Sequence, residues 1–220
     1  MHLDWTVPLR NLPMLLKGAG TTMIYTLIIF AIAFVISTAL AVVRFRRKIK
    51  ILSAIATVYV EIFRNIPCLV VMFIVYFGLP QFGIILSRNA AGISTVSIVI
   101  AAYLTEVIRS GIASVPHGQW EAGRCIGLNE VQTFFQIIYP QALRNVFPAI
   151  GNQFIGTLYA TSLLSTLDIR ELTQQAAILN SDTFRTFEIY TFVTVLYICM
   201  SQILQLLLKI VDNKVLTKRG

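Results

Sequence analysis

The chain has 220 residues, of which 56% are hydrophobic and 13% are charged, and its formal net charge is +8. A soluble domain carries about 25% charged residues, so this composition argues against a soluble protein and indicates that lipid is the solvent. The positive charge does not indicate nucleic-acid binding, because the aromatic residues lie within apolar runs and not on a basic face.

The first apolar segment carries no charged residue between Lys17 and Arg44. A helix of about 20 apolar residues crosses the roughly 30 Å of hydrocarbon in a bilayer, so we predict a membrane span at residues 20–43. A cleaved signal peptide is the weaker alternative, because the run is too long for one and a basic cluster follows it at once. That cluster, residues 44–50, holds five positive charges and is typical of a cytoplasmic loop.

The second predicted span, residues 54–79, is bent near Pro67 and contains Glu61 and Arg64 on one helix face. Each charge at the centre of a bilayer costs roughly 2.5–3.5 kcal/mol, so pairing would offset part of the cost. The two residues either form an ion pair that orients the helix or line a path for a solute that carries both charges, as an amino acid does.

Three further spans are predicted at residues 91–110, 146–166 and 189–209. Glu106 and Arg109, at the inner end of the third span, repeat the spacing of three and are interpreted as an interfacial pair or a brace. The fourth span is only moderately apolar, which suits a helix packed inside protein.

The fourth span also offers polar side chains for hydrogen bonds. Gln153, Thr161 and Ser162 could contact a solute, and for Thr161 and Ser162 the equal alternative is that small residues let helices pack closely. Within the outer segment 168–188 we expect one helix at residues 170–179.

The segment from Pro116 to Pro140, the 116–140 loop, is the longest mostly polar stretch and is predicted to form two short helices. Pro116 suits a first helical turn, Gly127 supplies a stop with positive φ, and Asn129 with Gln132 can form a capping box. The apolar residues expected to be buried are Trp120, Ala122, Gly123 and Ile126 in the first helix and Val131, Phe134, Phe135 and Ile138 in the second.

The same loop carries a resemblance to a known family. The series Glu121-Ala122-Gly123, then Gly127, then a close at Pro140 resembles the EAA loop of the membrane subunits of ABC importers, although Tyr139 stands where leucine is usual. Flanking segments at residues 106–112, 140–144 and 59–67 are similar to the polar amino acid permeases, the histidine, glutamate, glutamine, arginine and opine family. Residues 161–165 are similar too, but Ala160 replaces an aspartate of that pattern.

The resemblance implies an all-α polytopic membrane protein with the ABC type I importer permease fold, a single domain over residues 1–220 with five transmembrane helices. It implies that the 116–140 loop is a cytoplasmic coupling-helix loop. The implied ATPase-coupling residues are Gln119, Glu121, Ala122, Gly123, Arg124, Gly127 and Pro140. It also strengthens Arg64 as a residue of the substrate path, which we predict to comprise Glu61, Arg64, Gln153, Thr161 and Ser162.

The distribution of Lys and Arg predicts the orientation. With the N-terminus outside, the cytoplasmic side holds Arg44, Arg46, Arg47, Lys48, Lys50, Arg109, Arg124, Arg144, Lys209, Lys214, Lys218 and Arg219. The outer side holds Arg10, Lys17, Arg88, Arg170 and Arg185. We therefore expect a multi-pass protein of the bacterial inner membrane with its C-terminus in the cytoplasm.

The function expected from the resemblance is that of the translocation subunit of an ATP-driven importer for polar amino acids. The implied partners are an ABC ATPase, a second identical or different permease subunit, a periplasmic solute-binding protein and membrane lipid. No cofactor is expected on this chain, because no P-loop sequence occurs and ATP and Mg²⁺ would bind the ATPase. An ion-driven secondary amino acid transporter is the alternative, although no internal repeat is seen.

No enzymatic function is expected. The chain lacks a nucleophile–base constellation, and its two histidines and three cysteines do not have the spacing of a metal site. We therefore predict neither catalytic residues nor a metal site.

Overall fold

The computed structural model describes residues 3–46 and 50–213, which are mostly helical and contain no strand. The predicted cytoplasmic residues 47–49, Lys214, Lys218 and Arg219 lie outside this described part. The helices, with short π and 3-10 segments labelled η, are α1 (Thr6–Arg10), α2 (Leu12–Arg46), α3 (Lys50–Asn65), α4 (Cys68–Phe73), η1 (Ile74–Gly78), η2 (Leu79–Phe82), α5 (Arg88–Ser114), α6 (His117–Cys125), α7 (Glu130–Thr133), η3 (Phe134–Ile138), α8 (Tyr139–Ala160), η4 (Thr161–Leu167), α9 (Leu172–Thr183) and α10 (Thr186–Val211).

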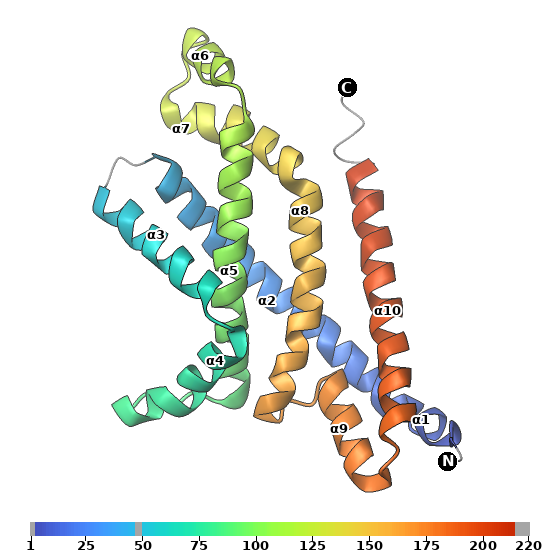
Figure 1. The fold of residues 1–220 in the computed structure, drawn as a ribbon. Coiled ribbons are helices and arrows are strands. Elements are labelled where there is room, and N and C mark those ends of the chain that lie inside the picture. The colour runs from blue at the N-terminus through green and yellow to red at the C-terminus, as the bar shows by residue number, and fades with distance from the viewer. Residues whose placement is uncertain (1–2, 47–49, 214–220) are drawn as a thin grey trace.

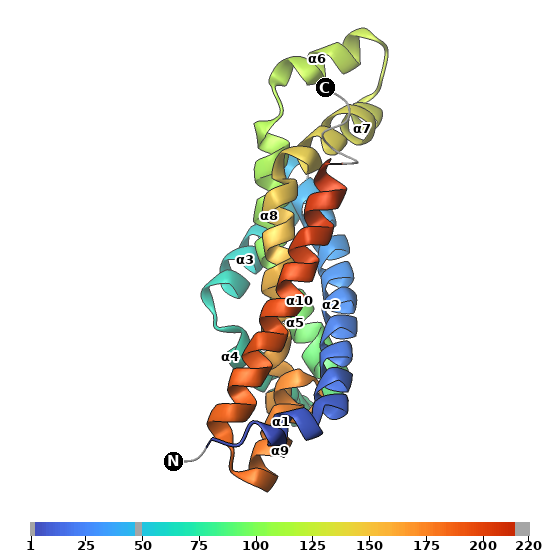
Figure 2. The same ribbon diagram turned by 90° about the vertical axis from the view of Figure 1, so that its right-hand side faces the viewer.

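Helix α5 is the centre of an elongated bundle, with α2 and α8 packed against it (Figure 1). Small residues on α5 and α8 permit close contact, since a Cβ atom at Gly111 would lie 2.7 Å from the carbonyl oxygen of Ala142. The 90° view places α6 at one end of the bundle and α1 with α9 at the other (Figure 2). The fold therefore separates the 116–140 loop from the predicted outer segment by the full length of the bundle.

Three helices of the described part are long and apolar enough to cross a membrane, namely Leu12–Arg44 within α2, Arg88–Ser114 and Thr186–Val211. They contain the predicted spans 20–43, 91–110 and 189–209. Helix α8 and η4 cover the predicted span 146–166, but α8 does not meet the same criterion of length and hydropathy. The count of five spans stays a prediction.

The predicted second span is sharply broken. Lys50–Asn65 and Cys68–Phe82 together are apolar enough for one crossing, but they meet at an angle of 107°. Pro67 has no backbone N–H and disfavours helical geometry at the residue before it, so α3 ends at Asn65 and α4 starts at Cys68. The expected position of the bend is confirmed, while its size makes this segment two helices with different directions.

The outer segment contains one helix, as expected, at Leu172–Thr183, slightly later than the predicted 170–179. Its start is tied to α2 and α10 by the wholly buried Glu171, whose Oε2 accepts hydrogen bonds from Thr22 (3.2 Å) and Tyr197 (3.1 Å). Burial raises the pKa of the Glu171 carboxyl above its ordinary value. Helix α9 is therefore a fixed part of the bundle.

Candidate functional site

The first helix of the 116–140 loop, α6, has well-defined ends. Pro116 precedes the helix as its N-cap with ψ 140°, so the expectation that it lies in the first turn is wrong by one position. At the other end Gly127 has φ 81°, a left-handed conformation that most residues resist. The N–H groups of Gly127 and Leu128 donate to the carbonyls of Arg124 and Gly123 at 3.0 Å, which is the Schellman arrangement.

The second helix, α7, begins at the predicted capping box. The Asn129 side chain accepts from the backbone N–H of Gln132, and the Gln132 side chain accepts from the backbone N–H of Asn129, both at 2.9 Å. The helix continues through the π segment η3 into α8, so Pro140 joins two helices instead of ending one. Because Pro140 cannot donate a backbone hydrogen bond, the wider turn just before it has a local cause.

The two helices touch at a position where no side chain fits. An ideal Cβ atom at the buried Gly123 would lie 2.5 Å from Cγ2 and 2.7 Å from Oγ1 of Thr133. The prediction that Gly123 faces inward is confirmed, and Trp120 is half-buried. Ala122 and Ile126 are exposed, the latter by 71%, so their predicted burial is wrong.

The core-facing side of η3 holds the 116–140 loop against the helical bundle. Phe134 and Ile138 are wholly buried, whereas Val131 and Phe135, predicted on the same face, are about half exposed. Helical spacing placed all four together, but the buried face is centred on Thr133, Phe134 and Ile138, so Val131 and Phe135 lie outside it.

This side of η3 belongs to an apolar cluster, called the seat, which joins residues of α2, α5, η3 and α8 with Val115. It contains Ala41 of α2, Ile108 and Ile112 of α5, Val115, Phe134 and Ile138 of η3, and Ala142 of α8. Tyr139, the departure from the usual leucine, places its hydroxyl 3.1 Å from that of Thr38 on α2. The loop is therefore held by α2, α5 and α8 together, and sequence reasoning did not foresee the contact with α2.

The opposite face of α6 is open and polar. Glu121 and Arg124 are exposed, and Glu121 lies 3.3 Å from His117 one turn earlier. Gln119 is half-buried and accepts a hydrogen bond of 3.1 Å from the side chain of Gln141. Of the predicted coupling residues, Glu121, Ala122 and Arg124 thus lie on the surface, while Gly123 and Gly127 shape the turn beneath them.

The ion pair, one of the two alternatives for Glu61 and Arg64, is not formed within the described residues. Both side chains are exposed, and the Arg64 guanidinium lies over the Tyr103 ring, 5.7 Å from its centroid. The hydroxyl of Tyr103 also donates to the Arg64 carbonyl at 3.1 Å. The contact with α5 has replaced the local pairing that the spacing of three suggested.

The other predicted substrate-path residues lie apart from this pair, on α8 and η4, and in Figure 1 α3 and α8 are on opposite sides of α5. Thr161 is wholly buried and donates to the Leu158 carbonyl at 2.6 Å, and Ser162 donates to the Tyr159 carbonyl at 2.7 Å. Gln153 is half-buried. Within this chain each hydroxyl therefore bonds to the carbonyl three residues earlier, an arrangement that is compatible with both interpretations.

A cavity of about 180 Å³ between α8 and α10 was not foreseen. Its polar lining includes Asn152, Gln205 and Lys209, and its apolar walls include Pro148 and Gly151. The sequence contained part of the signal, because Asn152 is a polar residue of the predicted fourth span and Pro148 and Gly151 are small residues near it. The other wall belongs to α10, which is distant in sequence, so the cavity could not be predicted.

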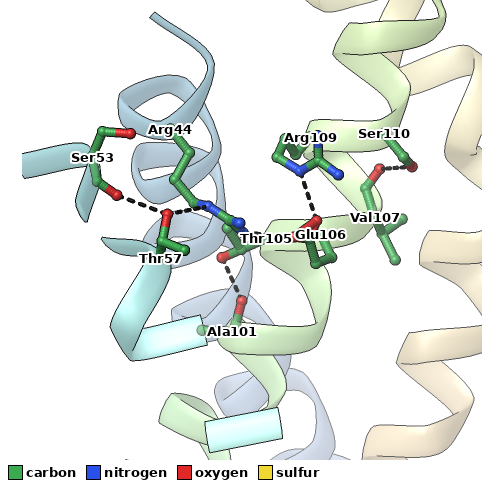
Figure 3. Close-up of polar contacts among 9 residues, drawn as sticks. All are labelled: Arg44, Ser53, Thr57, Ala101, Thr105, Glu106, Val107, Arg109 and Ser110. Atoms are coloured by element: carbon green, nitrogen blue, oxygen red, sulfur yellow. Dashed lines mark hydrogen bonds and ion pairs between the residues drawn. The ribbon is translucent and has the colours of Figure 1, made fainter. Parts of the chain in front are cut away.

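Toward the end of α5 that leads into α6, the predicted pair of Glu106 and Arg109 is formed, with 2.7 Å between Oε2 and Nε (Figure 3). Arg44 of α2 contacts the other carboxylate oxygen of Glu106, also at 2.7 Å. The carboxylate is thus shared by two arginines, of which sequence reasoning identified one.

Comparison with known proteins places this architecture among transport proteins. Residues 33–217 match the sequence model of a family described as binding-protein-dependent transport system inner membrane component. The chain is 38% identical over 191 residues to the probable glutamine ABC transporter permease protein GlnM of Bacillus subtilis (strain 168), covering 87% of this chain and 88% of that protein.

Two further similarities cover almost the whole chain. The nopaline transport system permease protein NocM of Agrobacterium fabrum is 32% identical over 220 residues, covering 96% of this chain and 91% of that protein. A chain from a crystal structure of an amino acid ABC transporter with histidines is 32% identical, with a TM-score of 0.89, covering 98% of this chain and 100% of that chain.

Proposed function

This chain belongs to the family of binding-protein-dependent transport system inner membrane components, and we propose that it is the translocation subunit of an ATP-driven importer of polar amino acids. The names of the relatives describe a glutamine ABC transporter permease, a nopaline transport system permease and an amino acid ABC transporter, and this supports the substrate class. Transport, and not chemical conversion, is the activity.

The observation that carries the proposal is the construction of the 116–140 loop. Helix α6 exposes a polar face, and its C-terminal turn leads into a buried seat on α2, α5 and α8. A short helix that is free on one side and rigidly held on the other suits docking into a groove of a soluble partner. We assign this partner as an ABC ATPase, which would hold the ATP and Mg²⁺, while Gln119, Glu121, Ala122, Gly123, Arg124, Gly127 and Pro140 form or shape the contact.

The mechanism follows from that rigidity. ATP binding would draw two ATPases together, each ATPase would displace the α6 helix docked on it, and the seat would move α2, α5 and α8 as one body. A second permease subunit, identical or different, completes the pair. Solute would arrive from a binding protein on the outer side and pass to the cytoplasm when the helices change their tilt.

The proposed topology has five crossings, with α8 as the fourth and the N-terminus outside. Helix α8 falls short of a lipid-facing span in hydropathy, which supports its placement inside the assembly. In this orientation the multi-pass chain lies in the bacterial inner membrane, with α6 on the cytoplasmic side.

For the solute path we propose Glu61, Arg64, Gln153, Thr161 and Ser162. Exposure of Glu61 and Arg64 within one chain leaves both charges available to a zwitterion. Because Ala160 stands where the family pattern has an aspartate, a cationic solute would need a carboxylate from elsewhere. Neutral or anionic amino acids therefore suit this subunit better.

The test is co-purification with the candidate ATPase and binding protein, followed by uptake into vesicles across a panel of labelled amino acids. We expect uptake that requires ATP and survives collapse of the ion gradients. Uptake that persists without ATP and stops when an ion gradient is removed would instead establish a secondary transporter.

A second measurement tests the orientation alone. Cys125 lies on the exposed side of α6, so in a Cys68→Ser/Cys199→Ser background it is the remaining thiol. A maleimide that cannot cross membranes should label it in inside-out vesicles and not in intact spheroplasts. The reverse pattern would remove the ATPase contact from consideration.

A further inference from the structure

Two arginines from different helices share the carboxylate of Glu106 (Figure 3). Its Oε1 accepts from Nη1 of Arg44 on α2, and its Oε2 accepts from Nε of Arg109 one turn further along α5, both at 2.7 Å. Arg44 also donates through Nε to the hydroxyl of Thr57 on α3 at 3.2 Å. One cluster therefore connects α2, α3 and α5.

The two arginines are not equivalent. The side chain of Arg44 is 11% exposed, whereas that of Arg109 is 42% exposed. Without the carboxylate, Arg109 could turn toward water, but Arg44 would be left as a largely buried positive charge without its partner, which is strongly unfavourable. The link that depends on Glu106 is therefore the one between α5 and α2.

The cluster lies on the direct route from the 116–140 loop to α3. Helix α5 ends at Ser114 and α6 begins at His117, with the buried Val115 between them. Further along α3, Tyr59 donates to the carbonyl of Ile98 on α5 at 2.6 Å. A displacement of α6 thus reaches α5 first, and it passes to α3 through these side-chain ties and through the packing of α3 on α5 and α2.

We propose that Glu106 is a positioning residue for transport: through Arg44 it locks α2 and α3 to the helix that carries α6, so that movement of α6 is delivered to the helix bearing Glu61 and Arg64. This inference rests on the proposed function. Loss of the link would leave α3 held by the Tyr59 hydrogen bond and by packing alone, so part of the movement of α6 would be lost before it reaches α3 and less solute would move per ATP hydrolysed.

The experiment measures solute molecules taken up per ATP hydrolysed, in vesicles that contain the complete transporter. Glu106→Gln preserves the shape of the side chain but removes its charge, and we expect the ratio to fall by about five-fold or more, the lower end of usual coupling between sites. Thr57→Val preserves shape and removes the hydroxyl that ties Arg44 to α3, together with that hydroxyl's local bond to the Ser53 carbonyl, and it should lower the ratio by less.

The different burial of Arg44 and Arg109 provides the decisive comparison. Adding Arg44→Gln to Glu106→Gln removes the stranded charge and allows two amides to meet, so the ratio should recover in part. Adding Arg109→Gln should not restore it. A merely structural brace would instead lower the yield and thermal stability of the complex, with an unchanged ratio in the molecules that assemble.

The matched control is the exposed pair of Arg88 and Asp168 at the outer end, 2.6 Å apart. Asp168→Asn preserves a residue that tolerates the local φ of 57° and should leave the ratio unchanged. An unaltered ratio in Glu106→Gln, or equal recovery by the two arginine substitutions, overturns the inference while transport itself stands. Hydrolysis without uptake by the wild type would overturn the proposed function.

Discussion

Gly123→Ala should disturb the 116–140 loop through one contact. The added Cβ would lie 2.5 Å from Cγ2 and 2.7 Å from Oγ1 of Thr133, whereas non-bonded carbon atoms prefer about 3.5–4.0 Å. Overpacking of this kind costs about 1–3 kcal/mol. Alanine also favours a helix by about 1 kcal/mol over glycine, which hides part of the cost in the single variant.

A double-mutant cycle measures the cost of the clash separately from the gain in helix propensity. Thr133→Ala removes both close atoms, and within the described residues the Thr133 hydroxyl is buried without a hydrogen-bond partner, so its removal costs little polar contact. The pair Gly123→Ala/Thr133→Ala should therefore show an interaction of about 1–3 kcal/mol. This corresponds to roughly 5–150-fold in the local opening equilibrium.

The assay is hydrogen exchange of peptides from residues 116–140 in the purified complex, together with uptake per ATP. Gly118→Ala is the control, since the same change in the same helix meets nothing within 4 Å. Exchange in Gly123→Ala should be faster than in the control and return toward wild type in the pair. Equal exchange in the two alanine variants, or no relief from Thr133→Ala, would refute the argued clash.

Three other substitutions test the remaining contacts. Gly127→Val should strain the turn by about 1–2 kcal/mol, because the residue has a φ of 81°, and should lower uptake per ATP while membrane insertion stays normal. Gly127→Asn should have a smaller effect, because asparagine tolerates this conformation. Equal loss of uptake in both variants would exclude backbone strain as the cause. Tyr139→Phe should lower the unfolding temperature of the complex by removing a hydrogen bond worth about 0.5–1.5 kcal/mol, and adding Thr38→Val should lower it little further; fully additive losses would contradict a shared bond. Arg64→Ala should reduce labelled amino acid uptake more than the amount of assembled complex, and a parallel loss of both would make Arg64 structural.

The parts of the fold that the sequence predicted are those governed by local chemistry. The charge-free stretch after Lys17 forms α2 because an uninterrupted apolar helix satisfies its own backbone. Gly127, Asn129 and Gln132 form the expected stop and cap, since those geometries involve residues only a few positions apart. The break at Pro67 has the same kind of cause, whereas no local residue pattern indicates its angle of 107°.

The candidate site was less predictable because its contacts join distant segments. The spacing of Glu61 and Arg64 suggested a pair, but Tyr103 of α5 lies against Arg64 instead. Arg44 is 62 positions away from Glu106, so no local pattern could indicate their contact. The buried face of the second helix includes the polar Thr133, which the periodicity of the apolar residues could not indicate.

The sharp corner between α3 and α4 has a consequence for how the chain enters the bilayer during synthesis. Helix α3 has 16 residues and is about 24 Å long, which is shorter than the roughly 30 Å of hydrocarbon that a transmembrane helix must cross. The two groups of α5 that form hydrogen bonds with α3, the Ile98 carbonyl and the Tyr103 hydroxyl, are synthesised after α3. We therefore expect an order during synthesis, in which the hydrogen bonds that fix α3 form only after α5 has been made.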